Sequence, residues 1–237
     1  MILVLFARVV MIADILPVKE IKKRYHAWKD WPRQMRIKTN GLPIVFENSY
    51  QRASKYWFYS GQLTYSLNLY RERRNNYHFW PIEDSLLGKP VFILDIHNLD
   101  SFQNKIKIGV DTLGYKYDPA WSSFAKVKFI TGQRQIHVKQ NEIFKMQITA
   151  ELSQFYYNYI AAHTDLKTEI VVGVFNKQGW VVDLPVSYNL YEMIQQQREI
   201  AFDPGLPKGK YYLIFSIFKE GTITPTHNSD KISLFVQ

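Results

Sequence analysis

Residues 43–81 read PIVFENSYQRASKYWFYSGQLTYSLNLYRERRNNYHFWP, and this stretch decides how the first half of the chain folds. Residues 43–47 are mostly apolar and predict a short strand, and residues 50–59 place large side chains near helical spacing. Residues 62–68 alternate apolar with polar side chains, which is typical of a strand. The arginine-rich residues 70–81 follow, so the stretch predicts a strand, a helix, a second strand and a polar loop.

Both ends of the expected helix carry a signal. Asn48 or Ser49 can accept a hydrogen bond from a backbone N–H two or three residues further on, as helix-capping residues do. Gly61 follows the last helical position and suits the left-handed conformation that ends many helices. The arginine-rich loop after the second strand lies where open α/β sheets usually place ligand-binding groups.

Aromatic and basic side chains are interleaved in this loop and in the helix before it, and two interpretations compete for them. In one, the aromatic rings fill the core and the arginines lie over them with solvated heads. In the other, Arg71, Arg73 and Arg74 offer paired donors to a phosphate or carboxylate, while tyrosines and Trp80 stack on a sugar or another planar face. Spacing alone leaves both interpretations open.

Length and composition predict two packed domains. The chain has 237 residues, which exceeds a typical single domain, and 46% of them are hydrophobic and 16% aromatic. The 22% of charged residues argues against disorder. The chain contains no cysteine, which excludes disulfides, thiol nucleophiles and thiolate metal sites.

The N-terminal residues 1–17 predict the end of a transmembrane helix. Met1 to Leu16 is apolar apart from Arg8 and Asp14, and Pro17 then breaks the run. A lone spanning helix needs roughly 20 apolar residues, so the expected helix begins upstream of Met1. The alternative is a buried or interfacial helix of a soluble protein.

Residues 18–40 predict a basic amphipathic connector at a membrane surface. Val18 to Thr39 holds eight lysines and arginines against two acidic residues, a large share of the net charge of +9. Basic side chains near anionic headgroups gain roughly 1 kcal/mol each. Tyr25, Trp28 and Trp31 fit an interfacial aromatic belt. Counted as a loop, this segment would lie on the cytoplasmic side.

The remaining sequence predicts a small α/β domain at 41–115 and an all-β antiparallel sandwich at 120–237. Residues 90–96 (PVFILDI) form a nearly continuous apolar run, typical of a strand buried on both faces. The region 97–114 is polar and predicts irregular structure. The strands expected after it are 124–130, 134–139, 142–152, 169–175, 199–203, 211–218 and 231–236, separated by turn signals. The exception is 188–197, where at least one helical turn is expected.

Familiar catalytic and cofactor motifs are absent. The six histidines show no metal-ligand spacing, and no G-x-S-x-G, P-loop or G-x-G-x-x-G occurs. Asp95, Asp100, Glu83 and Asp84 have the chemistry of a general base, but solvated or structural carboxylates are far commoner. The sequence therefore assigns no catalytic residue, no metal site and no cofactor.

Three runs, FENSYQRASKYWFYSG, SLNLYRERRNNYHFWP and GKPVFILD, resemble the extracytoplasmic C-terminal part of bacterial membrane glycosyltransferases of family thirty-nine. That family includes protein mannosyltransferase and aminoarabinose transferase types. The matching features are Tyr50, Gln51, Ala53 and Ser54 in the helix, Arg73, Tyr77 and Trp80 in an Arg-x-x-x-Tyr-x-x-Trp segment, and Gly88 before the strand Val91 to Leu94. The end of the chain, KGKYYLIFSIFKEGTITPTHNSD, resembles the β-sandwich tail of Bacteroides-type members.

The resemblance implies a region of an enzyme that transfers sugar from a polyprenyl-phosphate donor. The family's acidic catalytic residues lie in an early external loop that this sequence lacks, so the region would assist substrate binding and not be catalytic alone. The expected substrate-binding residues are Arg71, Arg73 and Arg74 for an anionic group, and Tyr50, Gln51, Tyr77 and Trp80 for sugar contacts or for shaping the loop. The soluble part would be periplasmic on the bacterial inner membrane, because all helices together set topology and overrule one basic segment.

The expected partners are the membrane, a lipid-phosphate-linked sugar or glycan acceptor, and the rest of the glycosyltransferase. An alternative is a free-standing, membrane-anchored carbohydrate-binding or envelope-interaction protein whose sandwich carries the ligand face. Aromatics beside basic residues also suit single-stranded nucleic acid. The apolar N-terminus argues against that third reading, so no nucleic acid is expected.

Overall fold

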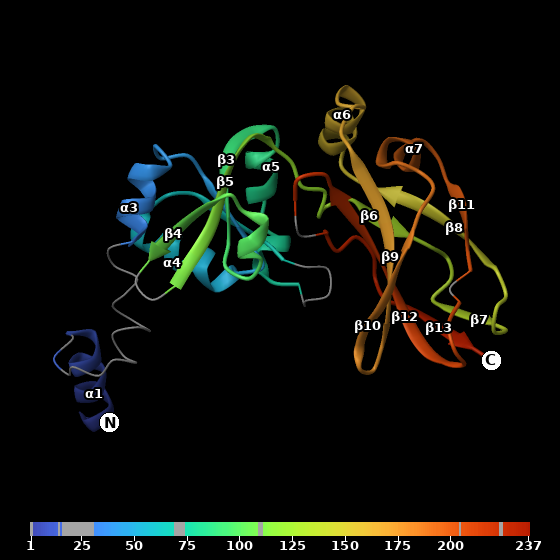
Figure 1. The fold of residues 1–237 in the computed structure, drawn as a ribbon, viewed down its shortest axis with the longest axis horizontal. Helices are drawn as coiled ribbons and strands as arrows, with labels where there is room; N and C mark the ends of the chain where they lie inside the picture. The colour runs from blue at the N-terminus through green and yellow to red at the C-terminus, as the bar shows by residue number, and fades with distance from the viewer. Residues whose placement is uncertain are drawn as a thin grey trace. The chain divides into compact units, whose positions relative to one another are not determined.

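The chain is a mixed α/β protein with strands in three sheets, shown as a computed structural model in Figure 1. The structure describes residues 2–13, 15, 31–68, 74–108, 111–203, 205–222 and 225–237. It divides into two compact units, Met1–Leu67 with Trp80–Trp121, and Asn68–Phe79 with Ser122–Gln237. The division differs from the expected ranges 41–115 and 120–237, because residues 68–79 group with the second unit.

The first unit is built on a five-stranded mixed sheet in the order β2-β1-β3-β5-β4. Its elements are α1 (Ile2–Ile12), α3 (Trp31–Lys38), β1 (Ile44–Glu47), α4 (Tyr50–Ser60), β2 (Thr64–Leu67), α5 (Ile82–Leu86), β3 (Lys89–Asp95), η3 (Leu99–Ser101), β4 (Asn104–Ile108) and β5 (Asp111–Trp121). Strand β1 pairs in parallel with β2 and β3, and β5 pairs antiparallel with β3 and β4. The expected strand–helix–strand order of the decisive stretch is confirmed.

Helices α4 and α5 cover opposite faces of this sheet. Thr64 and Tyr65 are consecutive in β2, so their side chains point to opposite faces. The Thr64 hydroxyl donates to the carbonyl of Ala53 in α4 at 3.0 Å, whereas the Tyr65 hydroxyl lies 3.5 Å from a carboxylate oxygen of Glu83 in α5. The β1–β2 end of the sheet is therefore covered on both faces, which explains why these two strands are buried along their whole length.

The ends of α4 follow only one of the two expected signals. Gly61 ends the helix in the left-handed conformation, with φ of 65°, and its N–H donates to the carbonyl of Trp57. Ser49 holds the N-cap position, but its side chain makes no capping bond and instead accepts a hydrogen bond from Arg52 at 3.2 Å. The helix start therefore depends on packing rather than on a cap.

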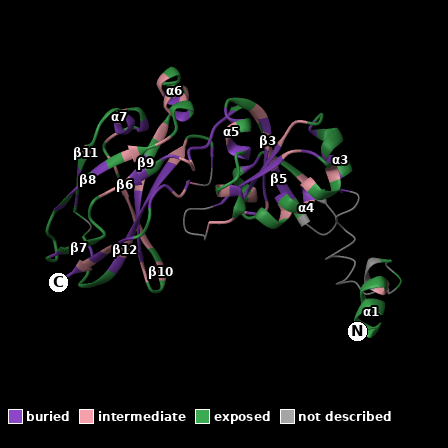
Figure 2. Cartoon of the chain, turned by 180° about the vertical axis from the view of Figure 1, so that it is seen from behind, coloured by how far each residue is buried: buried purple, intermediate pink, exposed green. Residues whose placement is uncertain are grey.

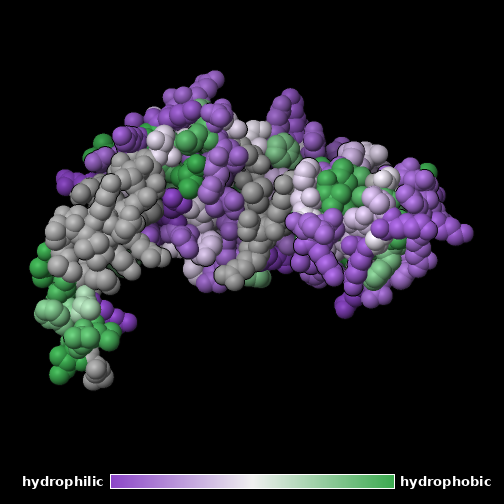
Figure 3. All heavy atoms as spheres, turned by 60° about the horizontal axis from the view of Figure 1, so that its bottom comes forward, coloured by the Kyte–Doolittle hydropathy of each residue, from purple (hydrophilic) through white to green (hydrophobic). Residues whose placement is uncertain are grey.

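Part of the predicted membrane connector, residues 18–40, packs against the first unit. Residues 16–30 lie outside the described residues, but Trp31 begins helix α3 and is buried, with its ring 5.2 Å from that of Tyr56 and 6.3 Å from that of Phe46. Trp31 thus belongs to the core of the first unit and not to an interfacial belt. The apolar side chains of residues 2–6 and of Val9 in α1 are exposed, and Figure 3 shows hydrophobic atoms on this helix. Among the described residues, no helix combines the length and apolarity needed to cross a bilayer.

The second unit contains the other two sheets, in the orders β10-β9-β12-β13-β7 and β11-β8-β6. Its elements are η2 (Asn76–His78), β6 (Lys128–Ile130), β7 (Gln135–Val138), β8 (Phe144–Glu151), α6 (Gln154–Ala162), β9 (Thr168–Asn176), β10 (Gly179–Pro185), α7 (Leu190–Gln195), β11 (Arg198–Phe202), β12 (Gly209–Lys219) and β13 (Ile232–Val236). Two details differ from the expected all-β antiparallel arrangement. Strand β7 pairs in parallel with β13, and α6 is a helix that the sequence reading did not expect.

Strand β12 lies in the core of this unit, because its residues 213–217 are all buried. Leu213, Phe215 and Ile217 are buried, and the Phe215 ring lies 5.7 Å from the ring of Phe129 in β6. Strands of the two sheets thus contribute to one apolar layer. Figure 2 shows the buried residues concentrated on the strands of each unit, with exposed residues on helices such as α6.

Candidate functional site

The carboxyl ends of the parallel strands in the first unit form one candidate position. The chain runs from β1 through α4 to β2 on one side of β1, and then through α5 to β3 on the other side. Ligands of open α/β sheets bind outside the carboxyl ends where the strand order reverses in this way. Tyr50 and Gln51, two of the predicted binding residues, begin α4 directly after β1, and both are exposed.

Two buried carboxylates lie at this same edge. The parallel register pairs Phe46 with Leu94, so Glu47 and Asp95 are neighbours one residue further on, and they are 1% and 2% exposed. Asp95 accepts hydrogen bonds from the backbone N–H of His97 at 2.8 Å and from the side chain of Asn98 at 2.9 Å. Asp95 therefore shapes the loop that follows β3. Sequence reasoning named Asp95 but passed over Glu47, although both are acidic residues at strand ends.

The arginine-rich loop contributes a second position, on the second unit. Arg71 and Arg73 lie outside the described residues. Arg74 donates from Nη2 to the backbone carbonyl of His227 at 3.3 Å, across 153 residues of chain. Among the described residues, no carboxylate forms an ion pair with its guanidinium.

A short 3₁₀ turn holds the loop after Arg74. The Asn75 side chain accepts from the backbone N–H of Tyr77 at 3.0 Å, and the Asn75 N–H donates to Nδ1 of His78 at 3.1 Å. Tyr77 is only 3% exposed. Of the two roles expected for Tyr77, this burial fits the shaping of the loop and leaves no ring surface for a sugar.

Arg74, His78 and His227 form what we call the arginine–histidine cluster. Burial, followed by the charge of Arg74, lowers the pKa of the His227 imidazole to about 4. Burial, and to a smaller extent Arg74, also lowers the pKa of the His78 imidazole. Both imidazoles are therefore neutral at pH 7, and the guanidinium supplies the positive charge of the cluster.

The structure thus distributes the predicted binding residues over both units. Tyr50, Gln51 and Trp80 belong to the first unit, and Trp80 is 42% exposed; Arg74 and Tyr77 belong to the second. His78 and His227 were not predicted, since their relation to Arg74 is tertiary and has no local signal. Within the described part of the chain, no three His, Asp or Glu side chains are grouped as metal ligands.

Comparison with known proteins adds no family assignment. No protein-family model matches the sequence, and no curated protein is significantly similar to it. Function therefore rests on the chemistry of the two positions described above.

Proposed function

We propose that the chain is the periplasmic C-terminal region of a bacterial inner-membrane glycosyltransferase that uses a polyprenyl-phosphate-sugar donor. In this proposal the region assists substrate binding, is not catalytic alone, and resembles the family thirty-nine enzymes in the decisive stretch. The observation that carries the proposal is the arginine–histidine cluster, which combines two neutral imidazoles with a guanidinium that pairs with no carboxylate of the described residues.

The cluster suits the phosphate of a lipid-linked sugar. A guanidinium presents five N–H donors in a fixed fork that matches phosphate oxygens. In Arg74 one terminal nitrogen, Nη2, donates a hydrogen bond to the His227 carbonyl. That bond orients the fork without neutralising its charge. Neutral imidazoles still offer one N–H each, so His78 and His227 can add donors without adding charge.

The carboxyl edge of the first unit suits hydroxyl-rich ligands. The exposed Tyr50 ring offers an apolar face with a polar tip, and Gln51 offers both a donor and an acceptor. We assign these two residues to contacts with sugar hydroxyls. We further propose that the two sheets of the second unit pack as a sandwich, which the contact between Phe129 and Phe215 supports.

The proposal is tested by binding of the full chain to a polyprenyl-phosphate-linked sugar in lipid nanodiscs. Arg74→Gln should weaken binding roughly tenfold or more, because a charge-assisted hydrogen bond contributes about 1.5–3 kcal/mol. Lys177→Gln is the matched control, since it removes one charge from the exposed β9–β10 turn of the same unit. Nanodiscs carrying the unphosphorylated polyprenol should bind no better than empty ones.

Equal binding by Arg74→Gln and the parent chain would contradict the proposal. Binding of free glycan with no preference for the phosphorylated lipid would instead favour the alternative, a free-standing carbohydrate-binding protein.

A further inference from the structure

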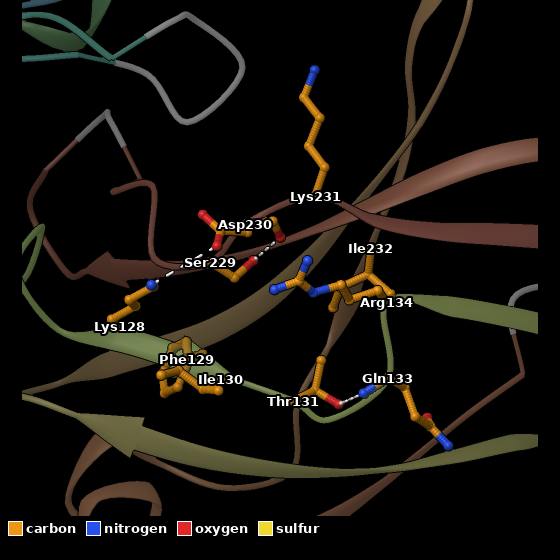
Figure 4. Close-up of a pocket in the computed structure, with 10 residues that line it drawn as sticks. All are labelled: Lys128, Phe129, Ile130, Thr131, Gln133, Arg134, Ser229, Asp230, Lys231 and Ile232. Atoms are coloured by element: carbon orange, nitrogen blue, oxygen red, sulfur yellow. Dashed lines mark hydrogen bonds and ion pairs between the residues drawn. The ribbon is translucent and has the colours of Figure 1, made fainter.

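The second unit contains a cavity of about 320 Å³ that the proposed function does not use. It lies between the end of β6, the residue before β7 and the start of β13, and Figure 4 shows its lining. The lining residues are Lys128, Phe129, Ile130, Thr131, Gln133, Arg134, Ser229, Asp230, Lys231 and Ile232. Ligand pockets of proteins span roughly 300–1,000 Å³, so this cavity suits a small ligand.

Three cations and one acid line the cavity, and two of the cations are already engaged. Lys128 pairs with Asp230 at 3.8 Å. The Lys231 ammonium lies 4.5 Å from the centre of the Tyr212 ring, and Figure 4 shows its side chain pointing away from the other lining residues. Lys231 therefore contributes charge at long range but no direct contact.

Arg134 is the cation that remains for a ligand. Its guanidinium has no acid, carbonyl or ring partner among the residues that the structure describes. Its backbone is nevertheless fixed, because the Arg134 carbonyl accepts from the N–H of Ser233 at 2.9 Å where β13 meets β7. In Figure 4 the Arg134 side chain extends toward Ser229, across the cavity.

The groups around Arg134 combine a rigid polar wall with an apolar floor. The Ser229 hydroxyl accepts from the N–H of Phe215 at 2.8 Å and donates to the carbonyl of Asp230 at 2.9 Å, which fixes that wall. The Thr131 hydroxyl accepts from the N–H of Gln133 at 3.2 Å. Its own proton has no acceptor among the described residues, so it is a donor for a ligand. Ile232, which is buried, contributes to the floor.

We propose that this cavity binds a small anionic sugar, with its phosphate or carboxylate on Arg134. A planar guanidinium pairs with either anion through two parallel hydrogen bonds. The sugar hydroxyls would bond to Thr131 and Gln133, and the ring carbons would lie on the apolar floor. None of these residues belongs to the arginine–histidine cluster, so this site stands independently of the proposed function.

The experiment is a calorimetric titration of the full chain with four probes: glucose 6-phosphate, glucuronic acid, glucose and inorganic phosphate. The two anionic sugars should bind saturably. Glucose, which lacks the anion, and inorganic phosphate, which lacks the sugar, should each bind at least roughly tenfold more weakly. The stronger of the two anionic sugars identifies the anion. Binding should weaken as salt is added, since Arg134 is exposed.

Variants assign the site. Arg134→Gln should lower the affinity for the tighter-binding anionic sugar roughly tenfold or more. The affinity of Arg134→Lys should lie between those of Arg134→Gln and the parent, since lysine keeps the charge but loses the planar fork of donors. Lys177→Gln should bind as the parent does, because its charge lies on the exposed β9–β10 turn, outside the cavity. An unchanged melting temperature of Arg134→Gln would show that folding is intact.

Three results would overturn the inference. They are parental affinity in Arg134→Gln, equal affinity for glucose and its phosphate, and inorganic phosphate binding as tightly as glucose 6-phosphate. Loss of binding in Arg74→Gln but not in Arg134→Gln would move the site to the cluster and overturn the inference as well.

Discussion

Replacing Asn228 with alanine is expected to lower the free energy of unfolding of the second unit by about 3–4 kcal/mol. Asn228 is fully buried, and its side-chain nitrogen donates to the carbonyls of Phe124 and Val127 at 2.6 and 2.7 Å. Its side-chain oxygen accepts from the N–H of Ile217 at 2.9 Å. One side chain thus ties the segment before β6 to the central strand β12.

The magnitude follows from the three hydrogen bonds that alanine would remove. The buried carbonyl of Val127 and the N–H of Ile217 lose their partners, whereas the carbonyl of Phe124 keeps the N–H of Val127 at 3.1 Å. Each lost bond costs about 1–3 kcal/mol. Water entering the space left by the amide offsets part of this cost, so the sum stays near the lower end of its range. The Thr226 hydroxyl, which also donates to Asn228, keeps the Ile217 carbonyl as an acceptor at 3.1 Å.

The assay is urea denaturation followed by circular dichroism. Asn158→Ala is the control, since Asn158 is exposed on α6 and its replacement should change stability by less than about 0.5 kcal/mol. Asn228→Asp should cost at least as much as alanine, because a carboxylate would face two carbonyl oxygens. A loss below about 1 kcal/mol in Asn228→Ala would refute the reasoning. Because Asn228 lies between His227 and Ser229, the same change should also weaken both binding positions.

Three further predictions concern stability. Gly114→Ala should destabilise the first unit by about 1–3 kcal/mol, because a Cβ there would lie 2.6 Å from Cγ of the buried Phe102; an unchanged melting temperature would contradict this. Trp31→Ala should cost about 3–5 kcal/mol by removing a buried ring that packs on Tyr56, and urea denaturation with a loss under about 1 kcal/mol would count against it. The folded-state pKa of His227, about 4, lies below its ordinary value of 6.5. Between these values the folded chain binds fewer protons than the unfolded chain. The contribution of His227 to stability is therefore full above pH 6.5 and is lost as the pH falls toward 4. His227→Gln should flatten this part of the stability profile between pH 7 and 4, and identical slopes would disprove the assignment.

Elements with strong periodicity could be predicted from sequence, and this covers the scaffold of the first unit. The β1–α4–β2 order follows from the alternation in β2, the helical spacing in α4 and the left-handed glycine at position 61. The last strands of the chain were found in the same way. Buried strands with continuous apolar runs, such as β3, can also be predicted from sequence.

Elements with mixed patterns were missed for identifiable reasons. Strand β4, with lysines alternating with isoleucines, lies at the edge of its sheet and was read as irregular because its overall composition is polar. Helix α6 is rich in aromatic residues, which favour strands. Ser153 caps this helix, because its hydroxyl accepts a hydrogen bond from the N–H of Tyr156. A serine at this position was the sequence signal for a helix start.

The candidate site shows a different limit. The loop could be singled out from its arginines, but the arginine–histidine cluster joins residues that are 153 positions apart. The cavity around Arg134 likewise depends on two segments, residues 128–134 and 229–232, that meet only in the folded unit. Strand pairing and core packing bring these residues together, so a local sequence pattern does not predict either group.

The most direct test of the proposed function is a heteronuclear NMR titration of the imidazole nitrogens of His78 and His227 with a short-chain polyprenyl-phosphate sugar. If the phosphate binds Arg74 in the arginine–histidine cluster, both imidazole signals should shift saturably, and Arg74→Gln should remove the shifts. Saturable binding that leaves both imidazole signals unchanged would place the phosphate elsewhere and contradict the account.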